Sequence, residues 1–240
     1  MKKLLFLVLL LPVLAIAQVT ERQVLTMSEL TIKQGHNDQF KAGVKMYKEC
    51  YEKNNGKESW GLWSRLQGEG TVYALTGMVK NWAELDKDDE AGKACRDIVV
   101  NMIMPHIEKS AYHLASTMPE MSTKKVNPDR TVVWVTYFRV KNSSLFNATL
   151  KEVHNTLKAV EGDIRGSWYS FMGGGENDPD YMVTSSYKNL AELDIEKDGV
   201  WKVMENKHGM KKTEQMRNDF RNSVDASWGY TYMLSKELSK

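Results

Sequence analysis

The chain has 240 residues, of which 42% are hydrophobic and 27% charged, and its formal net charge at pH 7 is +2. Such a balanced charge gives no electrostatic reason to bind nucleic acid or anionic lipid, so we expect no nucleic-acid partner. The hydrophobic content suits an ordinary globular core, and the length allows one or two domains.

The first 17 residues have the pattern of a secretory signal peptide. Two lysines precede an almost continuous apolar stretch from Leu4 to Leu14, and the segment ends in the small-x-small sequence Ala15-Ile16-Ala17. This apolar stretch is too short for a membrane span, which takes about 20 residues. We therefore expect cleavage after Ala17 and export to the periplasm or the extracellular space. The mature protein should have no integral membrane segment.

From residue 18 onward the elements follow one order twice. In residues 18–122 the pattern predicts strands and helices at Val24–Ile32 (strand), Phe40–Tyr51 (helix), Ser59–Leu66 and Thr71–Val79 (strands), Glu90–Lys109 (helix) and Tyr112–Thr117 (strand). After a proline-containing linker at 123–130, residues 131–240 repeat the order at Thr131–Val140, Phe146–Leu157, Gly166–Met172, Tyr181–Tyr187, Val200–Val224 and Trp228–Leu234.

A direct sequence match supports this repetition. Residues 80–86 read Lys-Asn-Trp-Ala-Glu-Leu-Asp, and residues 188–194, which lie 108 positions further on, differ from them at one position of the seven. The same offset pairs Trp60 with Trp168 and Tyr73 with Tyr181. Several matches at one offset indicate a tandem duplication of one unit.

Each unit therefore has the order β-α-β-β-α-β of the ferredoxin-like fold. Such a sheet carries helices on one face and leaves an apolar face uncovered, which a second copy can bury. The chain resembles the dimeric α/β-barrel superfamily, which includes antibiotic-biosynthesis-monooxygenase-like and NIPSNAP-like proteins. The resemblance implies an α+β fold in which two tandem ferredoxin-like units form an intrachain dimeric α/β barrel. Two separate ferredoxin-like domains are the alternative.

The resemblance does not select a cofactor. Members of the superfamily include oxygenases, haem-binding and haem-degrading enzymes, isomerases and proteins without known activity, and fold alone does not transfer function. The haem-degrading branch uses an Asn, a Trp and a His around the cofactor, and this trio does not map onto the present sequence position by position. We therefore predict no cofactor and leave haem and flavin open.

The chain has two cysteines, Cys50 and Cys95, both in the first unit. They fall near the end of one predicted helix and the start of the next, and these helices run antiparallel, so the two residues come to the same end of the sheet. Export permits a disulfide, which we expect here, and two reduced buried thiols are the alternative. Two cysteines alone do not make a metal site, and the five histidines lack ligand spacing, so we predict no metal.

Candidate pocket residues follow from strand geometry, because residues two apart on a strand share a face. If these faces point into the barrel, they form an aromatic cavity with a few polar groups, as ligand pockets usually are. We select His113 and Glu29 as candidate acid/base residues. The candidate ligand-binding residues are Tyr137, Arg139, Trp228 and Tyr230. Ordinary core packing explains any one aromatic residue equally well.

Two functions of different class follow. The first is an exported protein that binds, and could transform, a small apolar or aromatic molecule in a barrel pocket. The second is a non-catalytic structural or interaction module whose barrel is filled by side chains. The sequence does not decide whether the protein is an enzyme. A cavity of several hundred Å³ beside His113, Tyr137 or Arg139 would favour the first function.

Overall fold

The computed structural model describes residues 21–125 and 127–240, so the expected signal peptide at 1–17 lies outside the described residues. The first half contains β1 (Val24–Ile32), α1 (Asn37–Lys53), β2 (Trp60–Arg65), β3 (Thr71–Val79), η1 (Trp82–Asp86), α2 (Glu90–Ala94), α3 (Arg96–Ile98), η2 (Val99–Ile103), η3 (Met104–His106) and β4 (Ile107–Thr117). The second half contains η4 (Pro119–Met121), β5 (Val132–Val140), α4 (Ser143–Glu161), β6 (Ser167–Phe171), β7 (Tyr181–Tyr187), η5 (Leu190–Asp194), α5 (Val200–His208), α6 (Met210–Ser223) and β8 (Val224–Leu234). Within these described ranges, none of the helices has the length and apolar character needed to cross a bilayer.

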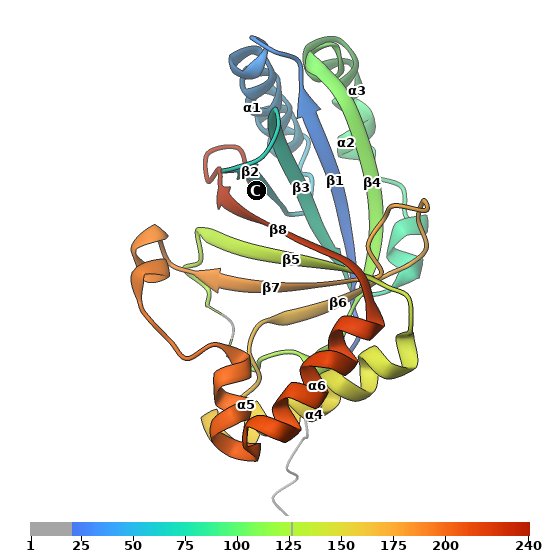
Figure 1. Ribbon diagram of the computed structural model, residues 1–240. Helices are drawn as coiled ribbons and strands as arrows, with labels where there is room; N and C mark the ends of the chain where they lie inside the picture. The colour runs from blue at the N-terminus through green and yellow to red at the C-terminus, as the bar shows by residue number, and fades with distance from the viewer. Residues whose placement is uncertain (1–20, 126) are drawn as a thin grey trace, which may run out of the picture.

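The strands form one closed barrel in the order β1-β3-β2-β8-β5-β7-β6-β4. Each half contributes four antiparallel strands in the same order, β2-β3-β1-β4 and β6-β7-β5-β8. The halves join through the pairs β2·β8 and β4·β6. The helices lie outside the barrel (Figure 1). The predicted fold class, two ferredoxin-like units in an intrachain α/β barrel, is confirmed.

Two details of the prediction are wrong. The second helix of each unit is not continuous. In the first unit it breaks into short pieces that end at His106, next to Pro105, and in the second it divides at Gly209, which has a positive φ of 80°. The last strand of each unit accordingly begins earlier than expected, at Ile107 and at Val224.

Strand pairing also corrects one sequence equivalence. Gly61 lies opposite Thr76, and Ser167 lies opposite Thr184, which is 108 positions after Thr76. Ser167 is only 106 positions after Gly61, so β6 is shifted by two residues relative to the offset that paired Trp60 with Trp168. A shift of two preserves which side chains point into the barrel.

Alternate residues of every strand point into the barrel and form its core, which includes Leu25, Met27, Ala74, Ala115, Val133, Val135, Tyr137, Phe171, Met182 and Tyr232. Outside the first sheet, α1 packs tightly through Phe40 and Val44 against Tyr73. The disulfide between Cys50 and Cys95 lies beside this packing, next to Tyr51.

The segment Ser235–Lys240 returns to the first half. Leu238 is buried in the cluster that α1 makes with the first sheet. The backbone of Lys240 exchanges two hydrogen bonds of 2.9 Å with Trp60, and its Nζ donates to the carbonyls of Gly56 and Glu58. The outer core of the first half is therefore completed by residues that follow the whole second half.

The second half is covered less tightly. Helix α4 begins at Asn142, whose side chain accepts a hydrogen bond from the Leu145 backbone N–H, and ends at the left-handed Gly162. Phe146 and Leu150 of α4 pack against one end of the sheet. Further along, helices α4, α5 and α6 pack against each other, and Trp134 on the outer sheet face is left 46% exposed.

Candidate functional site

A large cavity of about 1930 Å³ lies in the second half and continues into the barrel. Both faces of β5 line it, because Val133, Val135 and Tyr137 point into the barrel while Trp134 and Thr136 point outward. The cavity therefore has two parts. We call the part inside the barrel the lumen chamber and the part between the outer sheet face and helices α4 and α5 the sheet–helix chamber.

The lumen chamber is bounded by inward-pointing strand residues and by the connection between the two halves. Its lining includes Gln23, Leu25, Met27, Trp63, Ala74, Thr76, Met78, Lys125, Asn127, Arg130, Val133, Val135, Tyr137, Ser167, Tyr169, Met182, Thr184, Ser186 and Tyr232. The sheet–helix chamber includes Trp134, Thr136, Phe138, Leu150, Val153, His154, Leu157, Ile164, Arg165, Trp168, Val183, Ser185, Val200 and Trp201.

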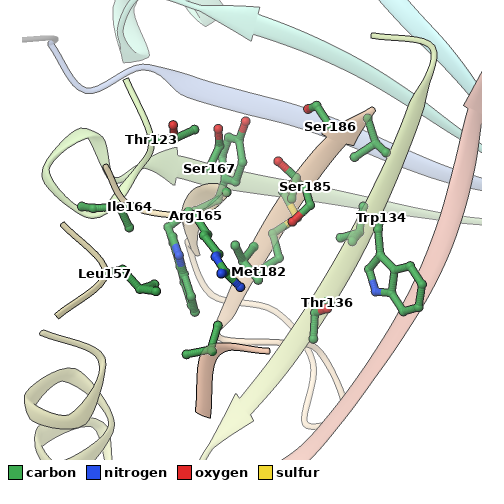
Figure 2. Close-up of a pocket in the computed structure, with 18 of the residues that line it drawn as sticks. Thr123, Trp134, Thr136, Leu157, Ile164, Arg165, Ser167, Met182, Ser185 and Ser186 are labelled. Atoms are coloured by element: carbon green, nitrogen blue, oxygen red, sulfur yellow. The ribbon is translucent and has the colours of Figure 1, made fainter. Parts of the chain in front are cut away.

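The chambers meet at the end of β7. Strand β6 begins at Ser167, opposite Thr184, so residues 185–187 of β7 extend beyond it. Ser185 and Ser186 point to opposite faces of the sheet there, and Figure 2 shows both of them near Ser167 and Thr123.

His154 is the most unusual polar side chain of the sheet–helix chamber. It lies on the buried face of α4 and is 5% exposed. Its ring makes no hydrogen bond with a described residue, and Nδ1 is buried without a partner. Burial lowers the pKa of His154 from 6.5 to about 4. The imidazole is therefore neutral at pH 7, with a ring nitrogen available to a ligand or a metal.

Trp168 stands against this histidine. The two rings are 5.5 Å apart at an angle of 66°, which is an edge-on contact, and the indole Nε1 is also buried without a hydrogen-bond partner. Folded proteins leave few buried polar atoms without a hydrogen-bond partner. Here two adjacent rings each carry one, which is expected where a bound molecule supplies the missing partner. Around them the chamber is mostly apolar.

Charged groups also line the sheet–helix chamber. Arg165 extends into it (Figure 2). Arg165 donates to both carboxylate oxygens of Glu161, at 2.9 and 2.5 Å, and to the Asp198 carbonyl at 2.8 Å. Lys197 and Lys207 line the same chamber from the exposed side, and the acidic residues Glu192 and Asp198 also line the cavity.

Two tyrosines form the floor of the lumen chamber. Tyr137 and Tyr232 are 4% and 2% exposed. Burial raises the pKa of Tyr137 well above 10, and burial together with the Glu29 carboxylate raises that of Tyr232 to about 12. The two hydroxyls also interact, in the sense that raises the pKa of Tyr137 and lowers that of Tyr232, as when Tyr232 accepts from Tyr137. Oη of Tyr232 is nevertheless buried without a partner at ordinary hydrogen-bond distance and angle, and its own proton is not donated to a described residue.

The structure brings most of the predicted site residues together behind this floor. Trp228 stacks on Tyr137 with ring centroids 5.6 Å apart. Glu29 lies 3.9 Å from the guanidinium of Arg65, which covers the ring of Tyr230 at 4.4 Å. These side chains close one end of the barrel, and among the predicted residues Tyr137 lines the cavity.

The other two candidates lie elsewhere. His113 makes an edge-on contact with Phe171 at 5.8 Å, inside the barrel but away from the cavity lining. Arg139 lies at the barrel rim, where it donates to Asp225 at 2.7 Å and to Asn177 at 3.0 Å. Strand pairing makes His113 and Tyr230 equivalent positions of the two halves, because they lie opposite Met27 and Val135, which are 108 positions apart.

His154, Trp168 and Tyr232 were not among the residues predicted from sequence patterns. A signal for His154 was present, since it follows Leu150 by four positions and Phe146 by eight and so shares their buried face. A metal ion held only by protein side chains would need several His, Cys, Asp or Glu residues close together. Residues 21–125 and 127–240 contain no such group of three or more.

No protein-family model matches the chain, and no curated protein sequence matches it. Solved structures do match. A candidate monooxygenase from Lactobacillus acidophilus NCFM superposes with a TM-score of 0.54 at 13% identity, over 92% of this chain and 99% of that one. The fold is that of the dimeric α/β barrels.

Two further structures agree with this assignment. A mutant chlorite dismutase from Candidatus Nitrospira defluvii matches with a TM-score of 0.53 at 8% identity, over 90% of this chain and 92% of its own. An anthrone oxidase-like protein matches with a TM-score of 0.50 at 11% identity, over 88% and 91%. At such identities the likeness establishes the shared barrel fold and leaves function to the residues of the site.

Proposed function

We propose that the protein binds a large planar, mostly apolar molecule of the haem type in the sheet–helix chamber, with His154 as the ligand to its iron. The observation that carries this proposal is the buried, neutral and unpaired imidazole of His154 inside an apolar cavity. An imidazole in this state is a common haem ligand.

The remaining walls suit such a molecule. Trp168 and Trp201 offer aromatic surface, and Trp134 lies exposed on the same outer sheet face as Trp168. Lys197 and Lys207 supply cations for the carboxylates that haem carries. Bound haem would supply redox chemistry at its iron, while the protein residues would hold it, orient it and keep water away.

The alternative of a barrel filled by side chains has less support. A cavity reaches Tyr137, and its volume exceeds the several hundred Å³ that a small-molecule site requires.

Titration of the purified full-length protein with haemin tests the proposal. We expect saturation at one equivalent with a shifted Soret band, and we expect His154→Ala to weaken binding at least tenfold and to change the band position. His113→Ala is the matched control and should bind like the wild type. Circular dichroism checks that each variant is folded. Absence of binding, or an unchanged spectrum in folded His154→Ala, would refute the assignment.

We also propose that residues 1–17 direct export and that the disulfide forms in an oxidising compartment. The disulfide between Cys50 and Cys95 supports this location, because such bonds are rare in reducing cytosol. Cell fractionation with thiol alkylation before lysis tests it. Reduced, alkylated protein confined to the cytosol would contradict it.

A further inference from the structure

We infer that the lumen chamber is a second binding site, for an apolar molecule that carries one carboxylate. Its inner floor is Tyr232 and its mouth lies at Arg130. This site is on the opposite face of β5 from the haem-type site proposed above, and the inference does not depend on that proposal.

The floor offers an unused hydrogen-bonding group. Tyr232 is 2% exposed, and its hydroxyl has no partner among the described residues although Tyr137 lies nearby. A buried hydroxyl without a partner is unfavourable, and a polar atom on a bound molecule would relieve this cost. Because Tyr232 is protonated at neutral pH, it can donate to an oxygen at the inner end of that molecule.

The walls are apolar. Leu25 and Met27 from β1 face Val133 and Val135 from β5 across the chamber, and Met182 of β7 completes this surface. Side chains of this kind favour a hydrocarbon or aromatic body and give it little directional hydrogen bonding. The inner end and the mouth therefore decide the orientation of the molecule.

The mouth is positively charged. Arg130 lines it, and its Nη1 donates to the Asn127 carbonyl at 3.2 Å. Arg130 is also near Tyr169, where its charge works against the rise that burial causes in the pKa of that tyrosine. Lys125 adds a second cation to this lining, while the acidic Glu192 of the same cavity accepts a hydrogen bond from the Lys188 backbone N–H at 2.7 Å. The remaining guanidinium donors of Arg130 can bind a carboxylate in the bidentate manner that arginine favours.

The charged pair behind the floor does not change this orientation. Glu29 and Arg65 lie beyond the tyrosines and form an ion pair at 3.9 Å, so their charges largely cancel. A carboxylate would meet the Glu29 charge if it pointed inward, whereas at the mouth it meets cations. The apolar body therefore enters first and the acid group stays at Arg130.

Calorimetric titration of the full-length protein with 2-naphthoate, 2-naphthamide and 6-hydroxy-2-naphthoate tests the site. We expect 2-naphthoate to bind more tightly than the neutral amide, and Arg130→Gln to weaken the acid at least tenfold while leaving the amide unchanged. The 6-hydroxyl group should tighten binding about 3- to 10-fold, as one hydrogen bond does. Tyr232→Phe, which keeps the aromatic ring, should remove this gain.

His154→Ala separates the two sites, since it should leave the naphthoate affinities unchanged. If His154→Ala abolishes naphthoate binding while Arg130→Gln and Tyr232→Phe do not alter it, the acid occupies the sheet–helix chamber and the inference is wrong. Failure of 2-naphthoate to bind at millimolar concentration would also overturn it. If haemin does not bind but the naphthoate results are as expected, the haem proposal is wrong and the inference about the lumen chamber stands.

Discussion

Acid should destabilise this protein through His154. The pKa of this residue is lowered from 6.5 to about 4 by burial. Above about pH 6.5 the ring is neutral in both the folded and the unfolded chain and gives no pH dependence. As the pH falls from 6.5 towards 4, the unfolded chain binds a proton that the folded chain does not, so the free energy of unfolding decreases.

The size of the effect follows from the shift. One pKa unit corresponds to about 1.4 kcal/mol, so the full difference between the two states amounts to about 3 kcal/mol. The ring borders a cavity that water can enter, which reduces the cost of charging it. We therefore expect His154 to account for a loss of about 2 kcal/mol between about pH 7.5 and about pH 4.5.

Urea unfolding at these two pH values, followed by circular dichroism, measures this difference. His154→Phe should lose less stability on acidification than the wild type, by the amount just given. Val153→Ala is the matched control on the same helix. It removes buried methyl groups and should lower the free energy of unfolding by a similar amount at both pH values. An equal loss on acidification in the wild type and His154→Phe would refute the reasoning.

Three further perturbations test the fold. Replacing Cys50 and Cys95 by Ser opens a loop with a sequence separation of 45 residues and should lower the free energy of unfolding by about 4 kcal/mol, which dithiothreitol should reproduce in the wild type. Gly166→Ala should cost about 1–3 kcal/mol in urea unfolding, because Gly166 has a φ of +76° and an added Cβ would lie 2.6 Å from Val183. Phe146→Ala, at a fully buried position, should cost about 3–5 kcal/mol, and a loss below 1 kcal/mol would contradict the packing described.

The fold could be predicted because its signals are local and repeated. Helical spacing in α1 and α4, strand alternation and the match between residues 80–86 and 188–194 all indicate the same unit. Element boundaries were less predictable. The break at Gly209 and the early start of β4 depend on backbone conformations that apolar periodicity does not report.

The site could be predicted only in part, because it depends on how tightly a helix layer covers a sheet. Parity put Tyr137 and Arg139 on one strand face without deciding whether that face points into the barrel, and the structure places Tyr137 in the barrel core. The chamber outside the second sheet arises because α5 and α6 pack on α4 instead of on Trp134. The equivalent layer of the first half is filled by Phe40 and its neighbours and tied by a disulfide. Two halves with the same strand order therefore differ in whether their helix layer leaves space over the sheet.

The docking of residues 235–240 on the first half has a consequence for synthesis on the ribosome. Leu238 belongs to the cluster formed by Phe40 and Val44, yet it is translated almost 200 residues after them. A nascent chain that has produced the first half still lacks this piece, together with the strands β6 and β8 that cover its two sheet edges. We therefore expect the emerging first half to depend on chaperone protection until translation is nearly finished.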